Sequence, residues 1–105
     1  MIKVTVLYPN KPGSRFDVDY YLNSHMPLAM RLMAPILKGV SVEIGLGGGM
    51  PGQAPPFVAM VGFSCDSVGE FGKLFAQHNA ELLADIPNYT DIEPVLQISE
   101  IRIAQ

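Results

Sequence analysis

The chain has few residues that could anchor a covalent or metal-bound structure. Of its 105 residues one is a cysteine, Cys65, and none is a tryptophan. A lone cysteine excludes an intrachain disulfide and a zinc site built on clustered cysteines. We interpret Cys65 as a small core residue at the end of a strand. The histidines and carboxylates form no close ligand motif, so we expect no metal.

Charged residues are also scarce. They make up 16% of the chain, against about 25% in an ordinary soluble domain, while hydrophobic residues make up 49%. The net charge is −3, and the seven Lys and Arg residues are scattered. Without a basic cluster, we expect neither nucleic acid nor a membrane surface as a partner. With so little charge to cover its surface, the chain should expose an apolar face that a second subunit covers, which predicts a homodimer.

Long apolar runs are absent as well. No segment approaches the roughly 20 residues that a membrane span needs, and residues 1–6 lack the layout of a signal peptide. We therefore expect a cytoplasmic protein. The length suits one domain that spans residues 1–105.

Hydrophobic periodicity predicts four strands and two helices. The strands fall at residues 2–8, 40–46, 57–65 and 95–103. The first helix begins near residue 17, is broken near Pro27 and ends before Pro35. The second begins at the capping box formed by Ser67 and Glu70 and runs to about residue 84. The order is that of an α+β, ferredoxin-like domain, with both helices on one face of a four-stranded antiparallel sheet.

The other face of the predicted sheet needs a cover. If side chains alternate along each strand, five apolar residues point there: Leu7, Val58, Met60, Leu96 and Ile98. Two such sheets packed face to face would form a dimeric α+β barrel.

The first helix places a phenol and an imidazole on its buried face. Tyr21 and His25 are four residues apart, on a stripe shared with Val18, Leu22, Leu28 and Leu32. A buried polar ring without a partner costs on the order of 1–3 kcal/mol, so these rings must find hydrogen bonds or line a cavity. Pro27 cannot donate to the Asn23 carbonyl, and we expect the helix to kink or restart just after His25.

Each candidate residue has a functional and a structural interpretation. His25 is a general acid or base, or a core histidine bonded to a backbone carbonyl, and both remain open. Tyr21 is a ligand-binding or weakly acidic residue, but a core tyrosine is favoured. Tyr20 is expected at the helix edge. His78 either shares a cavity with His25 or, as we favour, is partly exposed. It lies on the predicted buried stripe of the second helix, with Phe71, Leu74, Phe75 and Leu82.

Residues 85–93 concentrate polar groups before the last strand. Asp85, Asn88, Tyr89 and Asp91 would close a pocket or bind a ligand hydroxyl, but Asp and Asn also form turns with their own backbone, which we favour. Dimer contact is a second role. If a cavity exists, with Phe75 in its lining, its ligand is small and apolar or aromatic, with one polar handle held by His25 or Tyr21.

A glycine-rich run at residues 47–52 satisfies the pattern G-x-G-x-x-G. That fingerprint holds a dinucleotide only where a strand leads into a helix, and here another strand follows. We interpret residues 45–52 as a mobile hairpin loop and expect no cofactor.

Three separated motifs resemble the EthD family. They are Val-Leu-Tyr-Pro-Asn at 6–10, Arg-Phe-Asp-Val-Asp-Tyr-Tyr-Leu-Asn-Ser-His-Met-Pro-Leu at 15–28, and Ala-Asp-Ile-Pro-Asn-Tyr-Thr-Asp-Ile-Glu-Pro-Val-Leu-Gln-Ile at 84–98. The resemblance covers the whole chain. It implies a dimeric α+β barrel, shared with small monooxygenases, muconolactone isomerases and polyketide cyclases. The family takes its name from ethyl tert-butyl ether degradation, and the histidine before the proline, here His25, is its recurrent polar residue. The resemblance implies a fold rather than a reaction.

These observations favour a small homodimeric enzyme of catabolic or secondary metabolism. His25 would act as general acid or base on an apolar carbonyl or phenolic compound, by acid–base or cofactor-independent oxidative chemistry, as in an isomerase, a lyase or an oxidoreductase. The alternatives are a non-catalytic binding or accessory protein of an oxidase system, and a structural dimer with a filled interior.

Overall fold

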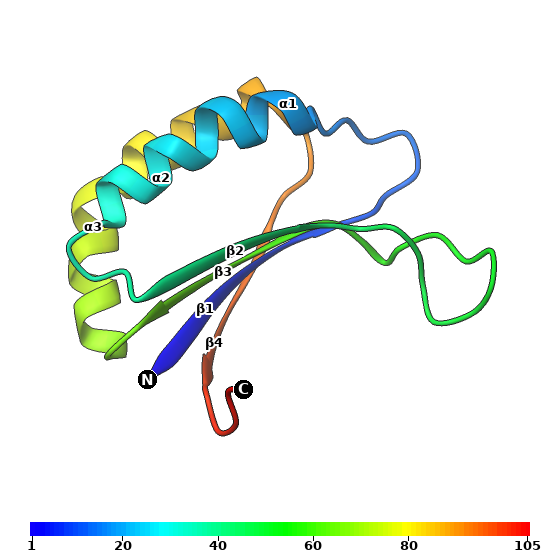
Figure 1. Cartoon of the computed structure of the whole chain (residues 1–105). Helices are drawn as coiled ribbons and strands as arrows, with labels where there is room; N and C mark the ends of the chain where they lie inside the picture. Colours follow the sequence, from blue (N-terminus) through cyan, green and yellow to red (C-terminus); the bar gives the residue numbers. More distant parts are fainter.

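The computed structural model describes residues 1–105 as one antiparallel sheet covered on one face by helices (Figure 1). The strands are β1 (Ile2–Pro9), β2 (Gly39–Ile44), β3 (Phe57–Cys65) and β4 (Val95–Glu100), in the sheet order β2-β3-β1-β4. β1 pairs antiparallel with both β3 and β4, and β2 pairs antiparallel with β3. The predicted ferredoxin-like architecture is confirmed. None of the helices is long and apolar enough to cross a membrane.

The first helical region is one rod in three segments. α1 (Val18–Tyr20) is capped by Asp17, whose carboxylate accepts a hydrogen bond from the Tyr20 backbone N–H at 3.1 Å. A π-helical turn, η1 (Tyr21–His25), follows, and α2 (Met26–Met33) begins one residue before Pro27. In η1 the Met26 N–H reaches the Tyr21 carbonyl. The predicted restart just after His25 is confirmed, because proline cannot make the backbone bond that a regular helix requires there.

The π turn changes which face of the helix is buried. Its extra residue rotates everything that follows, so α2 buries Met26, Ala29 and Met33. The predicted stripe is therefore wrong beyond His25, where Leu28 and Leu32 are only half-buried, and it is also wrong at Leu22, which is exposed. Tyr21 and His25 do lie on the buried face, with their rings stacked at a centroid distance of 5.5 Å.

The second helix, α3 (Val68–Asp85), leads into a 3-10 turn, η2 (Ile86–Asn88). Ser67 caps α3 by accepting a hydrogen bond from the Glu70 N–H at 3.1 Å, which confirms half of the predicted capping box. The Glu70 carboxylate accepts from the Ser67 hydroxyl at 3.4 Å and not from the Ser67 N–H. Although α3 has 18 residues, only Phe71 is buried. The helix therefore packs loosely against the sheet.

The strand register decides which side chains face the helices. Directly opposed residues in an antiparallel pair point to the same face, and Val6 lies opposite both Val61 and Leu96. Leu96, and Ile98 opposite Val4, therefore lie on the helix side. Their predicted place on the open face is wrong, because the alternation of β4 is set by its pairing with β1. The open face carries Leu7, Val58, Met60 and Val95, the last opposite Leu7.

Gly45, at the end of β2, is needed because the chain approaches it closely. A Cβ there would overlap the Phe57 carbonyl oxygen and lie 2.7 Å from Pro55 Cβ, whereas one at Gly49 would meet no atom within 4 Å. Gly45→Ala is expected to lower the free energy of unfolding by about 1–3 kcal/mol through this overlap. Gly49→Ala, the control, should change it by less than about 0.5 kcal/mol. Urea denaturation measures both, and equal midpoints for the two variants would contradict the close approach.

Candidate functional site

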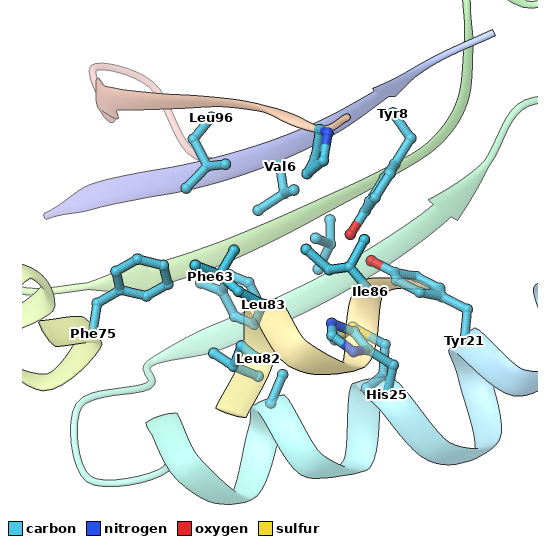
Figure 2. Close-up of a pocket in the computed structure, with 14 residues that line it drawn as sticks. Val6, Tyr8, Tyr21, His25, Phe63, Phe75, Leu82, Leu83, Ile86 and Leu96 are labelled. Atoms are coloured by element: carbon cyan, nitrogen blue, oxygen red, sulfur yellow. The ribbon is translucent and has the colours of Figure 1, made fainter. Parts of the chain in front are cut away.

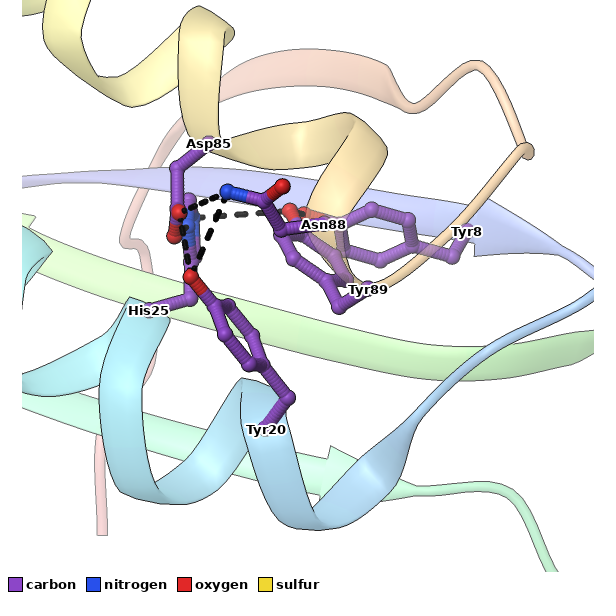
Figure 3. A network of polar contacts seen from close by, with 6 residues as sticks. All are labelled: Tyr8, Tyr20, His25, Asp85, Asn88 and Tyr89. Atoms are coloured by element: carbon purple, nitrogen blue, oxygen red, sulfur yellow. Dashed lines mark hydrogen bonds and ion pairs between the residues drawn. The ribbon is translucent and has the colours of Figure 1, made fainter.

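His25 is held by a carboxylate from the other helix. Its Nδ1 lies 2.9 Å from Asp85 Oδ2, and the two side chains are 9% and 15% exposed. The contact joins the end of η1 to the last residue of α3 (Figure 3). Because a carboxylate only accepts hydrogen bonds, the network assigns the proton to Nδ1, so that Nε2 of the neutral imidazole carries a lone pair that can accept a hydrogen bond or a proton.

Asp85 accepts hydrogen bonds from two further side chains. Its Oδ1 accepts hydrogen bonds from the Tyr20 hydroxyl at 2.6 Å and from the Asn88 amide at 2.9 Å. Burial alone would raise the pKa of Asp85, but the hydrogen bonds from Tyr20, Asn88 and His25 outweigh it and hold the pKa below its ordinary value of 3.8. The bond to Asp85 also raises the pKa of Tyr20. Asp85 is therefore a carboxylate at neutral pH and orients His25.

Two buried tyrosines continue the network on the other side of the imidazole. The Tyr89 hydroxyl lies 3.4 Å from His25 Nε2 and 2.7 Å from the Tyr8 hydroxyl. Burial raises the pKa of Tyr8, Tyr21 and Tyr89 well above the ordinary value. All three phenols keep their protons near neutral pH, so they act as hydrogen-bond donors rather than bases.

A cavity of about 80 Å³ lies between the helices and the sheet, next to this network. Its polar groups come from Tyr8, Tyr21 and His25, which lie together at one end, whereas Phe75 lies at the other (Figure 2). The remaining lining residues are apolar: Val6, Met26, Ala29, Val61, Phe63, Leu82, Leu83, Ile86, Pro94 and Leu96. The cavity suits a mainly apolar molecule with one polar group.

Tyr21 presents an unused hydrogen-bonding group to this cavity. The residue is fully buried, and its hydroxyl, whose nearest polar neighbour is the Tyr8 hydroxyl, makes no hydrogen bond of good geometry with the protein. In Figure 2 the hydroxyls of Tyr21 and Tyr8 point toward one another at the polar end. An unsatisfied buried hydroxyl costs about 1–3 kcal/mol, a cost that a ligand group accepting its hydrogen bond would remove.

Hydrogen bonds between residues 15–17 and residues 89–91 hold the network in place. The Thr90 hydroxyl donates to the Arg15 carbonyl at 2.6 Å, and the Asp17 N–H donates to the Tyr89 carbonyl at 2.8 Å. The Asp91 carboxylate accepts from the Arg15 N–H at 2.8 Å. These bonds set the start of α1 against the segment that carries Asn88 and Tyr89.

The structure brings together most of the residues that the sequence pointed to. Phe75 lines the cavity, and Asp85, Asn88 and Tyr89 surround His25 behind its wall. His78 does not join them, because it is not among the lining residues and its Nδ1 lies 3.8 Å from Glu81 on the outer part of α3. No three His, Cys, Asp or Glu side chains gather in an arrangement that would bind a metal ion.

Sequence reasoning missed Tyr8, the role of Tyr20 and the pairing of His25 with Asp85. Tyr8 fits the apolar alternation of β1, so its hydroxyl carried no separate signal. A signal for Asp85 did exist. Asp85 lies three residues after Leu82, on the face of α3 that carries the predicted apolar stripe. A carboxylate at that position lies opposite the inner face of the first helix, which carries His25.

These features define a small ferredoxin-like protein with a His–Asp pair and an unpartnered tyrosine around an apolar cavity. Residues 14–93 match the model of the EthD domain, and the chain belongs to the EthD family. No curated protein shows significant similarity to the chain.

Solved structures agree with this assignment. An EthD-like protein from Ralstonia eutropha JMP134 is 47% identical, with a TM-score of 0.95 over 99% of this chain and 94% of that one. An ethyl tert-butyl ether degradation (EthD) family protein from Bacillus halodurans C-125 is 19% identical, with a TM-score of 0.66 over 96% and 98%. A protein described as an antibiotic biosynthesis monooxygenase is 12% identical, with a TM-score of 0.52 over the same shares of the two chains. The last two similarities concern the fold alone.

Proposed function

We propose that this chain is an enzyme that moves a proton on a small, mainly apolar carbonyl or phenolic compound. The observation that carries the proposal is the fully buried Tyr21 hydroxyl, which makes no hydrogen bond of good geometry with the protein and lies beside His25 at the polar end of the cavity. A substrate oxygen placed there would accept the Tyr21 hydrogen bond. His25 would then lie close to the hydrogen on the carbon next to the carbonyl, which the carbonyl group makes acidic.

The proton transfer uses each residue of the network in a defined role. His25 Nε2 takes a proton from the carbon next to the carbonyl, and the electron pair of the broken C–H bond moves onto the carbonyl oxygen. Tyr21 donates to that oxygen as its negative charge develops, while Asp85 stabilises the imidazolium. Delivery of the proton to a different carbon of a conjugated enolate completes an isomerisation. Delivery of a deuteron, after the imidazolium N–H has exchanged with D₂O, completes a hydrogen exchange at the original carbon. With a phenol, His25 takes the hydroxyl proton instead.

Deuterium exchange tests this proposal without knowledge of the natural substrate. The protein should accelerate exchange of the α-hydrogens of a small ketone in D₂O, followed by proton NMR. Tyr21→Phe is expected to slow that exchange about 100-fold, because it removes the donor to the developing oxyanion and changes little else. Leu22→Ala, on the exposed side of η1, is the control and should leave the rate unchanged. A Tyr21→Phe protein as fast as the parent would contradict the role of the hydroxyl. Binding of the ketone without exchange would favour the non-catalytic alternative.

We also infer that two copies associate through the open face of the sheet. Its apolar centre, formed by Leu7, Val58, Met60 and Val95, is not covered by any helix of the chain. Light scattering is expected to give twice the chain mass for the parent protein and the chain mass for Met60→Glu, which would bury a charge in the interface. Met30→Glu, on the exposed side of α2, is the control and should remain a dimer. A monomeric parent, or a dimeric Met60→Glu, would contradict this interface.

A further inference from the structure

The space beneath α3 is incompletely filled along much of the helix. α2 buries three of its eight residues, whereas α3 buries one of 18. Leu96 and Ile98 of β4 face the helix side of the sheet, yet each remains 46% exposed. The buried residues accordingly form two core clusters, one around Tyr21 and Tyr89 and the other around Met33 and Phe71. A small domain ordinarily has one contiguous core.

A second cavity lies between these clusters, next to the first. It measures about 40 Å³ and is lined only by apolar residues. Val4, Met33 and Phe71 belong to it alone. It shares a wall with the first cavity, made of Val6, Ala29, Phe63, Phe75, Leu82 and Leu96. The first cavity runs from Tyr21 and His25 to Phe75 (Figure 2), and Phe75 also lines the second, wholly apolar cavity, which reaches Phe71.

We propose that the two cavities form one elongated slot, and that its ligand is a slender molecule with an oxygen at one end and an unbranched apolar tail. The oxygen lies at Tyr21 and His25, and the tail runs between α2 and α3 toward Phe71. This inference rests on the proposed function for the position of the oxygen and adds the shape of the ligand. Scaled from the ~150 Å³ cavity that holds benzene, the two cavities, of about 80 and 40 Å³, together take about five non-hydrogen atoms. Phe71 sets the length of the tail.

Straight-chain methyl ketones with three to about nine carbons are suitable probes, with affinities measured by isothermal titration calorimetry. Each added methylene that becomes buried should raise the affinity about fourfold, until the slot is full and the gain stops. For the parent protein we expect this break at about four carbons, which together with the oxygen make the roughly five non-hydrogen atoms that the cavities hold. An isomeric ketone with a branched tail should bind more weakly than the straight chain with the same number of carbons.

Two substitutions at Phe71 should move the break in opposite directions. Phe71→Trp fills the apolar end, so butanone should gain no affinity over acetone, while the affinity for acetone stays within twofold. Phe71→Leu lengthens the slot and should delay the break. Tyr21→Phe should lower the affinity for every ketone by about the same factor, on the order of fivefold, with the break unmoved. Phe57→Trp, on β3 outside both cavities, is the matched control and should change neither quantity.

The outcomes separate this inference from the proposed function. A break that stays in place in both Phe71 variants, or an affinity that is independent of chain length, would overturn the elongated slot. The absence of ketone binding to the parent protein would overturn it too. If the break moves as expected but no α-hydrogen exchange occurs, the slot is supported and the proton transfer fails. If exchange occurs but the break does not move, the proton transfer is supported and the slot fails.

Discussion

Replacement of His25 by glutamine is expected to abolish proton transfer while the protein keeps its stability. The glutamine amide can still donate to Asp85 Oδ2, as His25 Nδ1 does at 2.9 Å, but it cannot take up a proton near pH 7. The rate of α-hydrogen exchange should fall on the order of 10³-fold. The free energy of unfolding should change by less than about 1 kcal/mol, which corresponds to a few degrees in melting temperature for a domain of this size.

His25→Asn and His78→Gln complete this experiment. The shorter asparagine should also eliminate exchange, whereas His78→Gln, outside the cavity, should alter neither exchange nor melting. If His25 were only a core residue, both His25 variants would melt many degrees lower, because a buried donor or acceptor would lose its partner at a cost of about 1–3 kcal/mol. That result would contradict the catalytic assignment even before a substrate is known.

The helices and strands could be predicted from sequence because their signals are local. The apolar run of β3 gave its limits, Phe57–Cys65, and Ser67 with Glu70 gave the start of α3. The prediction of which residues are buried was wrong where one local irregularity changes the orientation of a longer segment. The π turn at residues 21–25 adds one residue to the helix, and this turned Leu28 and Leu32 away from the core in favour of Ala29 and Met33.

Features that depend on distant pairing could not be derived from periodicity. The face occupied by Leu96 follows from its register opposite Val6, 90 positions earlier. The partner of His25 lies 60 positions away, on another helix. The sequence indicates that His25 needs a hydrogen-bond partner or a cavity, and the structure contains both. The partner is the carboxylate of Asp85 and not a backbone carbonyl.

Replacement of Asp85 by asparagine is expected to inactivate His25 without removing it. Oδ1 accepts from both Tyr20 and Asn88, so the asparagine oxygen should keep that position and turn its amide group toward His25 Nδ1. Nδ1 must then accept a hydrogen bond, which moves the imidazole proton to Nε2 and eliminates the lone pair that serves as base. Exchange should slow by about 10²- to 10⁴-fold. Asn88→Ser removes one donor to Asp85 but leaves the tautomer of His25 in place, so its rate should stay close to that of the parent.

The same substitution should remove a pH-dependent part of the stability. The pKa of Asp85 is lower in the folded protein than its ordinary value of 3.8, so its ionised form stabilises the fold above that value. The stability difference between the parent and Asp85→Asn should be largest near neutral pH and should shrink as the pH falls below 3.8, through the lowered pKa of the folded state. Urea denaturation at a series of pH values measures this difference. A constant difference from neutral pH to pH values below that pKa would show that Asp85 is not the ionised partner of His25, and the mechanism would lose the group that stabilises its imidazolium.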